Sequence, residues 1–334
     1  MKATPFFVVA LFLAFAGAAS GSAAERPGTP FRLPGELASA KRVVVLGDSI
    51  TYGGTYVDFV EMVVRQADPT WRGEILDLGL PSETVSGLSE DGHAGGKFPR
   101  PDLHERLDRT LAQTKPDLVL ACYGMNDGIY HPFSEERFER FRSGIVRLHD
   151  KVVASGAAII HLTPPVFDAQ PIRDKVLPVG LVAYPKPFAG YDDVLARYAV
   201  WLLEQRAKGW QVIDVHGPMR RELEARRRTA PEFTFAKDGV HADRFGHAAI
   251  ARAILAEWKF PAAAVEAPMG WAAERDGELL QLIQKRRKLL SDAWLTAIGH
   301  KRPMTPGRPL EEATREAAVL TEKIAAVVFA RGAR

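Results

Sequence analysis

The residues with the clearest potential for chemistry are a serine near the start of the chain and an Asp–His pair near residue 240. Ser49 stands just beyond the apolar run 43–46, where a buried strand would end. A serine there is either a nucleophile or only the cap of a following helix. Asp238 and His241 are three residues apart, so the carboxylate can reach imidazole Nδ1–H and leave Nε2 free. A local hydrogen bond in a loop would explain the same pair.

A serine hydrolase also needs hydrogen-bond donors for the oxyanion of its tetrahedral intermediate. Candidates are the backbone N–H groups of Ser49 and Gly79 and the side-chain amide of Asn126. Simple turn or cap roles would explain Gly79 and Asn126 equally well. The G-x-S-x-G pattern is absent, since Thr51 stands where its second glycine belongs. The pattern therefore disfavours an ordinary α/β-hydrolase.

Two histidines lie in or just after a long Gly/Ser-rich connection over residues 81–100. His93 and His104 could line a substrate pocket near Gly79, and a solvated loop explains them as well. No signature of a metal or nucleotide site is present, because "HERLD" at 104–108 lacks the second histidine of a zinc protease and "GHAGGKF" at 92–98 is not a P-loop. We expect no metal and no other cofactor.

Strands and helices alternate along most of the chain, and they must position these residues. Short apolar runs predict strands at 42–47, 73–79, 116–124, 156–165 and 209–217. Helical periodicity predicts helices at 56–67, 101–114, 134–155, 190–208 and 243–258. This alternation indicates an α/β fold with a parallel sheet and helices on both faces. Ligands bind at the carboxyl ends of such strands, where the candidate residues fall.

Four short blocks in this order resemble the SGNH hydrolases, also called GDSL-type esterases and lipases. They are "GDSIT" around Ser49, "LGL" around Gly79, "GMND" at 124–127 and "DGVH" at 238–241. The resemblance covers about residues 42–257. Ile50 replaces the usual leucine of the first block, and the asparagine common near Gly79 is not obvious here.

The resemblance implies a three-layer flavodoxin-like fold with five parallel strands in the order 2-1-3-4-5. It implies Ser49 as nucleophile, His241 as base and Asp238 as the acid that orients it. Ser49, Gly79 and Asn126 would form the oxyanion hole.

The two ends of the chain lie outside this pattern. Lys2, an apolar run over 5–19 and small residues before Glu25 predict a signal peptide at 1–24. An uncleaved anchor is the alternative, although the run is shorter than the ~20 residues that span a bilayer. We expect an irregular leader at 25–40, an SGNH hydrolase domain at 41–260 and a C-terminal helical extension at 261–334. The extension contains expected helices at 278–299 and 310–330.

Composition narrows the function further. The 334 residues carry a formal charge of only +3, with both signs interspersed, which argues against a nucleic-acid partner. The single cysteine, Cys122, lies in an apolar run and is expected to be a buried thiol.

We therefore expect a secreted or periplasmic serine esterase that hydrolyses a small acyl ester, with acetyl favoured, on a carbohydrate. Its partner would be a small-molecule or polysaccharide ester, with no stable membrane insertion after signal cleavage. A lysophospholipase or thioesterase, an acyltransferase and an inactive carbohydrate-binding protein are alternatives. No exposed apolar flap, which a lipase would show, is evident. The oligomeric state is not predicted.

Overall fold

A parallel sheet of five strands lies at the centre of the computed structural model, which describes residues 33–273 and 277–332. The strands are β1 (Arg42–Gly47), β2 (Glu74–Asp77), β3 (Leu118–Cys122), β4 (Ala158–Leu162) and β5 (Gln211–Ile213). Their order is β2-β1-β3-β4-β5, and every pairing is parallel. The expected order and direction are confirmed. The expected signal peptide at 1–24 lies outside the described residues.

The central strands are mostly apolar because both of their faces are covered. All five residues of β3 are buried, including Cys122, which confirms the expected buried thiol. Only β1 begins and ends where the sequence predicts. The other strands are shorter than expected at both of their ends.

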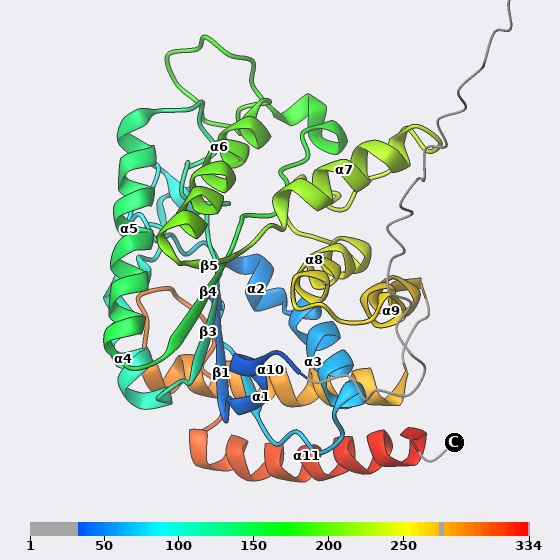
Figure 1. Cartoon of the computed structure of the whole chain (residues 1–334). Helices are drawn as coiled ribbons and strands as arrows, with labels where there is room; N and C mark the ends of the chain where they lie inside the picture. The colour runs from blue at the N-terminus through cyan, green and yellow to red at the C-terminus, as the bar shows by residue number, and fades with distance from the viewer. Residues whose placement is uncertain (1–32, 274–276, 333–334) are drawn as a thin grey trace, which may run out of the picture. The chain divides into compact units, whose positions relative to one another are not determined.

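Helices cover both faces of the sheet and make three layers (Figure 1). α3 (Thr55–Ala67) and α8 (Arg244–Glu257) pack together on one face. α4 (Leu103–Thr114), α5 (Glu135–Ala154) and α6 (Tyr191–Glu204) cover the other. The Phe141 and Tyr198 rings stack 4.4 Å apart and join α5 to α6. Within the described chain, no helix is both long enough and apolar enough to cross a bilayer.

Several short elements have no counterpart among the expected ones. They are α1 (Gly35–Ser39), α2 (Ser49–Gly53), η1 (His93–Gly96), η2 (Gln170–Lys175), α7 (His216–Arg227) and α9 (Ala262–Ala273), whereas η3 (Gln205–Lys208) completes the helix expected at 190–208. α1 lies within the segment expected to be irregular. It forms because Leu37 is buried and its carbonyl accepts a hydrogen bond from Trp71 Nε1 at 3.0 Å. α7 was missed because its charged sequence shows only a narrow apolar stripe.

Two long helices follow this block: α10 (Glu278–Ile298) and α11 (Leu310–Gly332). α10 packs against α3 and the edge strand β2, and α11 packs against α10 (Figure 1, orange and red). Two adjacent arginines of α10 are buried in ion pairs. Arg286 pairs with Glu61, and Arg287 lies 2.7 Å from Asp58. The division into a domain at 41–260 and an extension stays a prediction.

Candidate active site

A chain of two hydrogen bonds joins Ser49, His241 and Asp238. Ser49 is the first residue of α2, directly beyond β1, and its Oγ lies 2.8 Å from His241 Nε2. The other ring nitrogen, Nδ1, lies 2.6 Å from Asp238 Oδ2. The side chains of Asp238 and His241 are each 57% exposed, so the chain opens to solvent. This geometry suits transfer of the serine proton to the imidazole.

The loop before α8 holds this pair in place through its own backbone. Asp238 Oδ1 accepts hydrogen bonds from the N–H groups of Val240 (3.0 Å) and His241 (2.8 Å). Gly239 has φ +81° and fits against the carbonyl of Asp168, 2.6 Å from where a Cβ would lie. Partial burial opposes ionisation of Asp238, but the hydrogen bonds from His241 and Val240 outweigh it. The pKa of Asp238 is therefore lowered, which keeps the carboxylate charged beside the ring.

The sharp turn at Ser49 depends on its two preceding residues. A Cβ on Gly47 would lie 2.1 Å from Thr51 Oγ1, so a larger residue would displace α2. Asp48 is buried, and its Oδ1 accepts from Ile50 N at 2.9 Å. The helix cap is therefore Asp48, which leaves the Ser49 side chain free to meet His241. Burial raises the pKa of Asp48 to about 7.

Asn126 is held by three hydrogen bonds that define which way its amide faces. Its Oδ1 accepts from Arg100 Nη1 at 2.8 Å and from Tyr130 Oη at 3.0 Å. Its Nδ2 donates to Glu83 O at 3.2 Å. Because Oδ1 accepts from two donors, it must be the oxygen, and the other end of the amide must be the nitrogen. Nδ2 has two N–H groups, one bound to Glu83 and one that remains free. Ile129 and Tyr130 have φ +47° and +58°, strained values of the kind that cluster at functional sites.

Gly79 lies against α2 as expected, but its N–H is engaged elsewhere. A Cβ on Gly79 would lie 2.4 Å from Tyr52 N, so only glycine permits this approach. Its N–H donates to Asp77 Oδ1 at 3.0 Å. Ser82, three residues later, has φ +67°, and none of the hydrogen bonds found in the described residues uses its N–H. Nothing in the sequence marks Ser82, because its backbone angle cannot be read from residue type.

The two candidate histidines of the long connection are placed differently. His93 Nδ1 lies 3.2 Å from Glu90 Oε1, and Glu90 also binds Arg100, so three contacts separate His93 from Asn126. His104 lies between α4 and α5, with Nε2 3.1 Å from the Gly144 carbonyl. Burial and the charge of Arg147 lower its pKa to about 4. The structure does not bring His104 to the Ser49 cluster.

A groove of about 800 Å³ runs beside the site. It is lined by the 89–94 segment, Arg100, residues 129–131 and residues 182–187. Arg100 and Tyr130 belong both to this groove and to the hydrogen bonds of Asn126. Val182, which lines the groove, has an exposed side chain, as do Val179 and Leu181 just before it in the chain. Three exposed aliphatic side chains do not make a lipase-type flap, so the expectation that the chain has none stays a prediction.

In the described residues, no three or more His, Cys, Asp or Glu side chains are grouped to hold a metal ion.

Comparison with known proteins gives a family and a fold. Residues 45–249 match the GDSL-like Lipase/Acylhydrolase family. No curated protein matches the chain. The structure resembles a gut microbial diltiazem-metabolizing enzyme with a TM-score of 0.51 and 20% identity, over 66% of this chain and 47% of that one. This chain thus spans about half the length of that neighbour.

A second neighbour is a catalytic mutant of an acetylxylan esterase from Geobacillus stearothermophilus. It has a TM-score of 0.50 and 19% identity, over 68% of this chain and 97% of the esterase. Another mutant of that esterase, described as an acetyl-xylooligosaccharide esterase, has a TM-score of 0.51 and 19% identity, over 68% and 98%. At these identities the likeness shows the fold.

Proposed function

The chain belongs to the GDSL-like lipase/acylhydrolase family, and on that premise we propose that it is a carboxylic ester hydrolase, a secreted serine esterase removing a small acyl group, acetyl above all, from a carbohydrate. The observation that carries the proposal is the hydrogen-bonded chain from Ser49 Oγ through His241 to Asp238. Export rests on the expected signal peptide and stays a prediction.

In the proposed mechanism Ser49 Oγ attacks the ester carbonyl while His241 Nε2 takes its proton. Asp238 holds the ring with Nδ1–H toward the carboxylate and stabilises the imidazolium that forms. The alcohol leaves with the proton from His241, and an acyl-enzyme remains on Ser49. Water, deprotonated by His241, then releases the acid and restores the serine.

We assign the oxyanion to the N–H of Ser49 and the free N–H of Asn126. Asn126 suits this role because Arg100 and Tyr130 fix its amide before substrate arrives, so no reorganisation is needed. The Gly79 N–H already donates to Asp77, so it can serve as the third oxyanion donor only if that hydrogen bond breaks. Ser82 N–H is the alternative third donor, because it is free in the described structure and adjoins Glu83, which Asn126 contacts.

The choice of a carbohydrate rests on the hydrogen-bonding and aromatic groups that lie beside the site. The groove beside it carries Glu90, Arg100, Tyr130 and Tyr184, which supply hydrogen-bonding groups and ring faces for sugars. Two of the structural neighbours are described as acetylxylan or acetyl-xylooligosaccharide esterases, which agrees with this choice.

One observation favours a second candidate, a lipid acyl hydrolase such as a lysophospholipase or thioesterase. Val182, which lines the groove, exposes its apolar side chain, as do Val179 and Leu181 just before it in the chain, and these could contact an acyl chain. The ratio of kcat/KM for p-nitrophenyl acetate to that for p-nitrophenyl decanoate separates the two. A ratio above one supports the small-acyl enzyme, and a ratio far below one supports the lipid hydrolase.

The central test compares wild type with Ser49→Ala on p-nitrophenyl acetate and with a fluorophosphonate probe. We expect Ser49→Ala to lose about 10³-fold or more in kcat/KM and all labelling, because the nucleophile is absent. Ser143→Ala, at an exposed serine of α5, is the matched control and should keep both. Activity of Ser49→Ala near the wild-type level would refute the mechanism. An unlabelled, inactive wild type would support a binding protein that has lost catalysis.

A further inference from the structure

The connection between α10 and α11 reaches back to the long 81–100 segment beside the site. Arg302, in this connection, donates from Nη1 to Ser82 Oγ at 3.0 Å. Its guanidinium also lies over the Phe98 ring, 4.9 Å from the centroid. Residues more than 200 positions apart in the chain thus meet at one edge of the candidate oxyanion site.

Arg302 completes a closed ring of contacts that includes Asn126. From Asn126 the ring passes through Arg100 (2.8 Å) to Glu90, and from Glu90 to His93 (3.2 Å). The His93 and Phe98 rings meet edge to face at 5.5 Å, and the Arg302 guanidinium lies over the Phe98 ring. Arg302 also binds Ser82, whose neighbour Glu83 accepts from Asn126, and this closes the ring. We call this set the rim ring. Its members are Ser82, Glu83, Glu90, His93, Phe98, Arg100, Asn126 and Arg302.

The two arginines of the rim ring differ in how their charge is balanced. Glu90 binds Arg100 through two oxygens, at 2.6 Å and 2.7 Å, and so neutralises it. In the described part of the chain Arg302 has no carboxylate partner, and its buried Nε has no hydrogen-bond partner. Burial and the charge of Arg100 lower the pKa of Arg302, as expected for a guanidinium that lacks an anion. A half-buried, unpaired guanidinium is poised to bind an anion, because its donors match two oxygens of one group.

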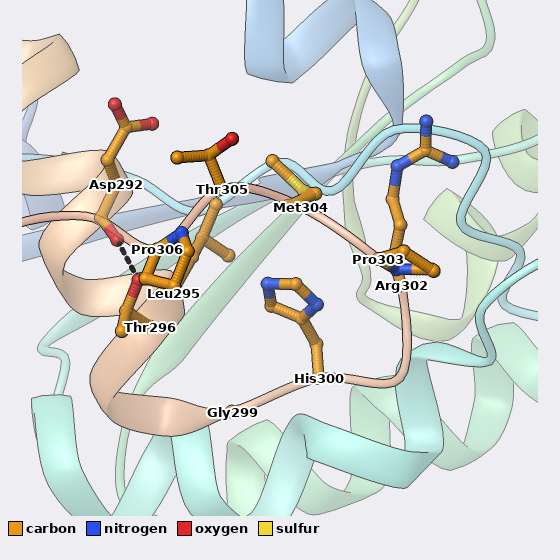
Figure 2. Close-up of a pocket in the computed structure, with 10 residues that line it drawn as sticks. All are labelled: Asp292, Leu295, Thr296, Gly299, His300, Arg302, Pro303, Met304, Thr305 and Pro306. Atoms are coloured by element: carbon orange, nitrogen blue, oxygen red, sulfur yellow. Dashed lines mark hydrogen bonds between the residues drawn. The ribbon is translucent and has the colours of Figure 1, made fainter.

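The connection that carries Arg302 also lines a small cavity with both polar and apolar walls. A cavity of about 240 Å³ is lined by Arg302, His300 and the end of α10. In Figure 2 the His300 ring points into this cavity, and the Arg302 side chain extends from the same connection with its guanidinium away from that ring. His300 Nδ1 is buried without a hydrogen-bond partner, but the Arg302 guanidinium faces away from this cavity, so the cavity itself is not where an anion would meet Arg302.

We propose that Arg302 binds an anionic group, a carboxylate or a sulfate, on the alcohol part of the substrate, so that the enzyme acts on acyl esters of acidic glycans. The anion belongs to the alcohol part because a small acyl group such as acetyl carries no charge. Arg302 contacts Ser82 while Asn126 contacts the adjoining Glu83, so the guanidinium lies on the same edge of the site as the proposed oxyanion donor. This inference rests on the proposed esterase function.

The test measures acetate release from three O-acetylated polymers: polygalacturonate, sulfated dextran and neutral xylan. For wild type we expect kcat/KM on at least one acidic polymer to exceed that on xylan by about 10-fold. This preference should shrink as salt rises, because salt screens a half-exposed charge pair. Which acidic polymer is preferred identifies carboxylate or sulfate as the bound group.

Three variants locate the effect. Arg302→Gln should lower kcat/KM on the preferred acidic polymer about 10-fold more than on xylan, because the charged donor is lost. Arg302→Lys should keep part of the preference for the acidic polymer. It is measured in place of Arg302→Gln if the glutamine variant does not fold. Lys301→Gln, at the exposed neighbouring residue, is the matched control and should keep the whole preference.

Several results would overturn the proposal. They are a wild type that prefers xylan or shows no preference, an Arg302→Gln loss equal on all three polymers, and a Lys301→Gln loss as large as that of Arg302→Gln. In each case Ser49-dependent hydrolysis of p-nitrophenyl acetate would show that the esterase function itself still holds. Absence of that hydrolysis in wild type would instead refute the proposed function.

Discussion

Arg287 of α10 lies 3.2 Å from Asp77 at the end of β2, and this contact ties the C-terminal helices to the candidate site. The same guanidinium donates to the Gly53 carbonyl at 3.0 Å, at the end of the short helix that begins with Ser49. Asp77 in turn accepts the Gly79 N–H at 3.0 Å. One arginine thus supports both the helix of the serine and the turn of Gly79.

Replacing Arg287 by methionine should destabilise the protein by about 3–5 kcal/mol, because two buried carboxylates lose their counter-charge. Burial already raises the pKa values of Asp58 and Asp77 to about 6, so each folded-state carboxyl holds its proton more tightly than in the unfolded chain. The folded state therefore loses stability as pH rises from about 4 through these values, and Arg287→Met makes the loss larger. Urea unfolding at about pH 5 and pH 8 measures it.

Arg315→Met is the control for that experiment, since Arg315 forms an exposed ion pair on α11. Its free energy of unfolding should change by less than about 0.5 kcal/mol at either pH. A similar small change for Arg287→Met would show that its buried pairs contribute little.

Asp238→Asn should lower kcat roughly 10²- to 10⁴-fold, because an amide can stabilise the wrong tautomer of His241 and cannot balance an imidazolium. The 57% exposure of the pair favours the smaller end of this range, since water screens its charge. KM for p-nitrophenyl acetate should change little. Asp193→Asn, at an exposed carboxylate of α6, should retain wild-type kcat. Wild-type kcat in Asp238→Asn would exclude Asp238 as the orienting acid.

Asn126→Ala should lower kcat about 10²-fold or more, because it removes a donor placed for the oxyanion. Tyr130→Phe deletes one of the two bonds that orient the amide, so a smaller loss in kcat is expected, with KM nearly constant. Stopped-flow measurement of acyl-enzyme formation reports both. If Tyr130→Phe cost more than Asn126→Ala, the amide would not be the group that Tyr130 supports.

The buried histidine of β4 should make the protein lose stability in mild acid. Burial, and to a smaller extent the charge of the nearby His149, lower the pKa of His161 to about 3. The unfolded chain binds this proton below about pH 6.5 while the folded protein does not, so stability falls as pH drops toward 3. From about pH 7 to pH 5 this group alone costs about 2 kcal/mol.

The variant His161→Phe keeps a ring in the stack with Trp210, 5.0 Å away, but cannot take up a proton. We expect its unfolding free energy to vary less between about pH 7 and pH 5 than that of wild type, by about 2 kcal/mol, in urea titrations. An equal pH dependence in the two proteins would assign the acid sensitivity to other groups.

The fold could be predicted from local pattern because the main strands and helices are long or strongly apolar. The run from Val43 to Leu46 predicts β1 with its ends, and the order of the sheet followed from the family resemblance. Elements of about one turn, such as α2, and charged ones, such as α7, were missed because tertiary contacts rather than periodicity stabilise them.

The candidate site was predictable where residue type itself carries the chemistry, as at Ser49, Asp238 and His241, which the structure brings together. Their catalytic roles stay predictions. The free N–H of Ser82 could not be foreseen, because it depends on a backbone angle. Arg302 could not be foreseen either, because its contact with Ser82 joins distant parts of the chain and no local pattern reports it.

The buried ion pairs between α10 and α3 also affect when α3 can pack in its native position during synthesis. Asp58 and Glu61 leave the ribosome long before Arg286 and Arg287, which follow 225 or more residues later. Until then α3 cannot bury these carboxylates against charged partners, so its native packing waits for the last part of the chain. A stalled or proteolysed product that ends before α10 would remain incompletely folded even though it contains every residue of the proposed triad.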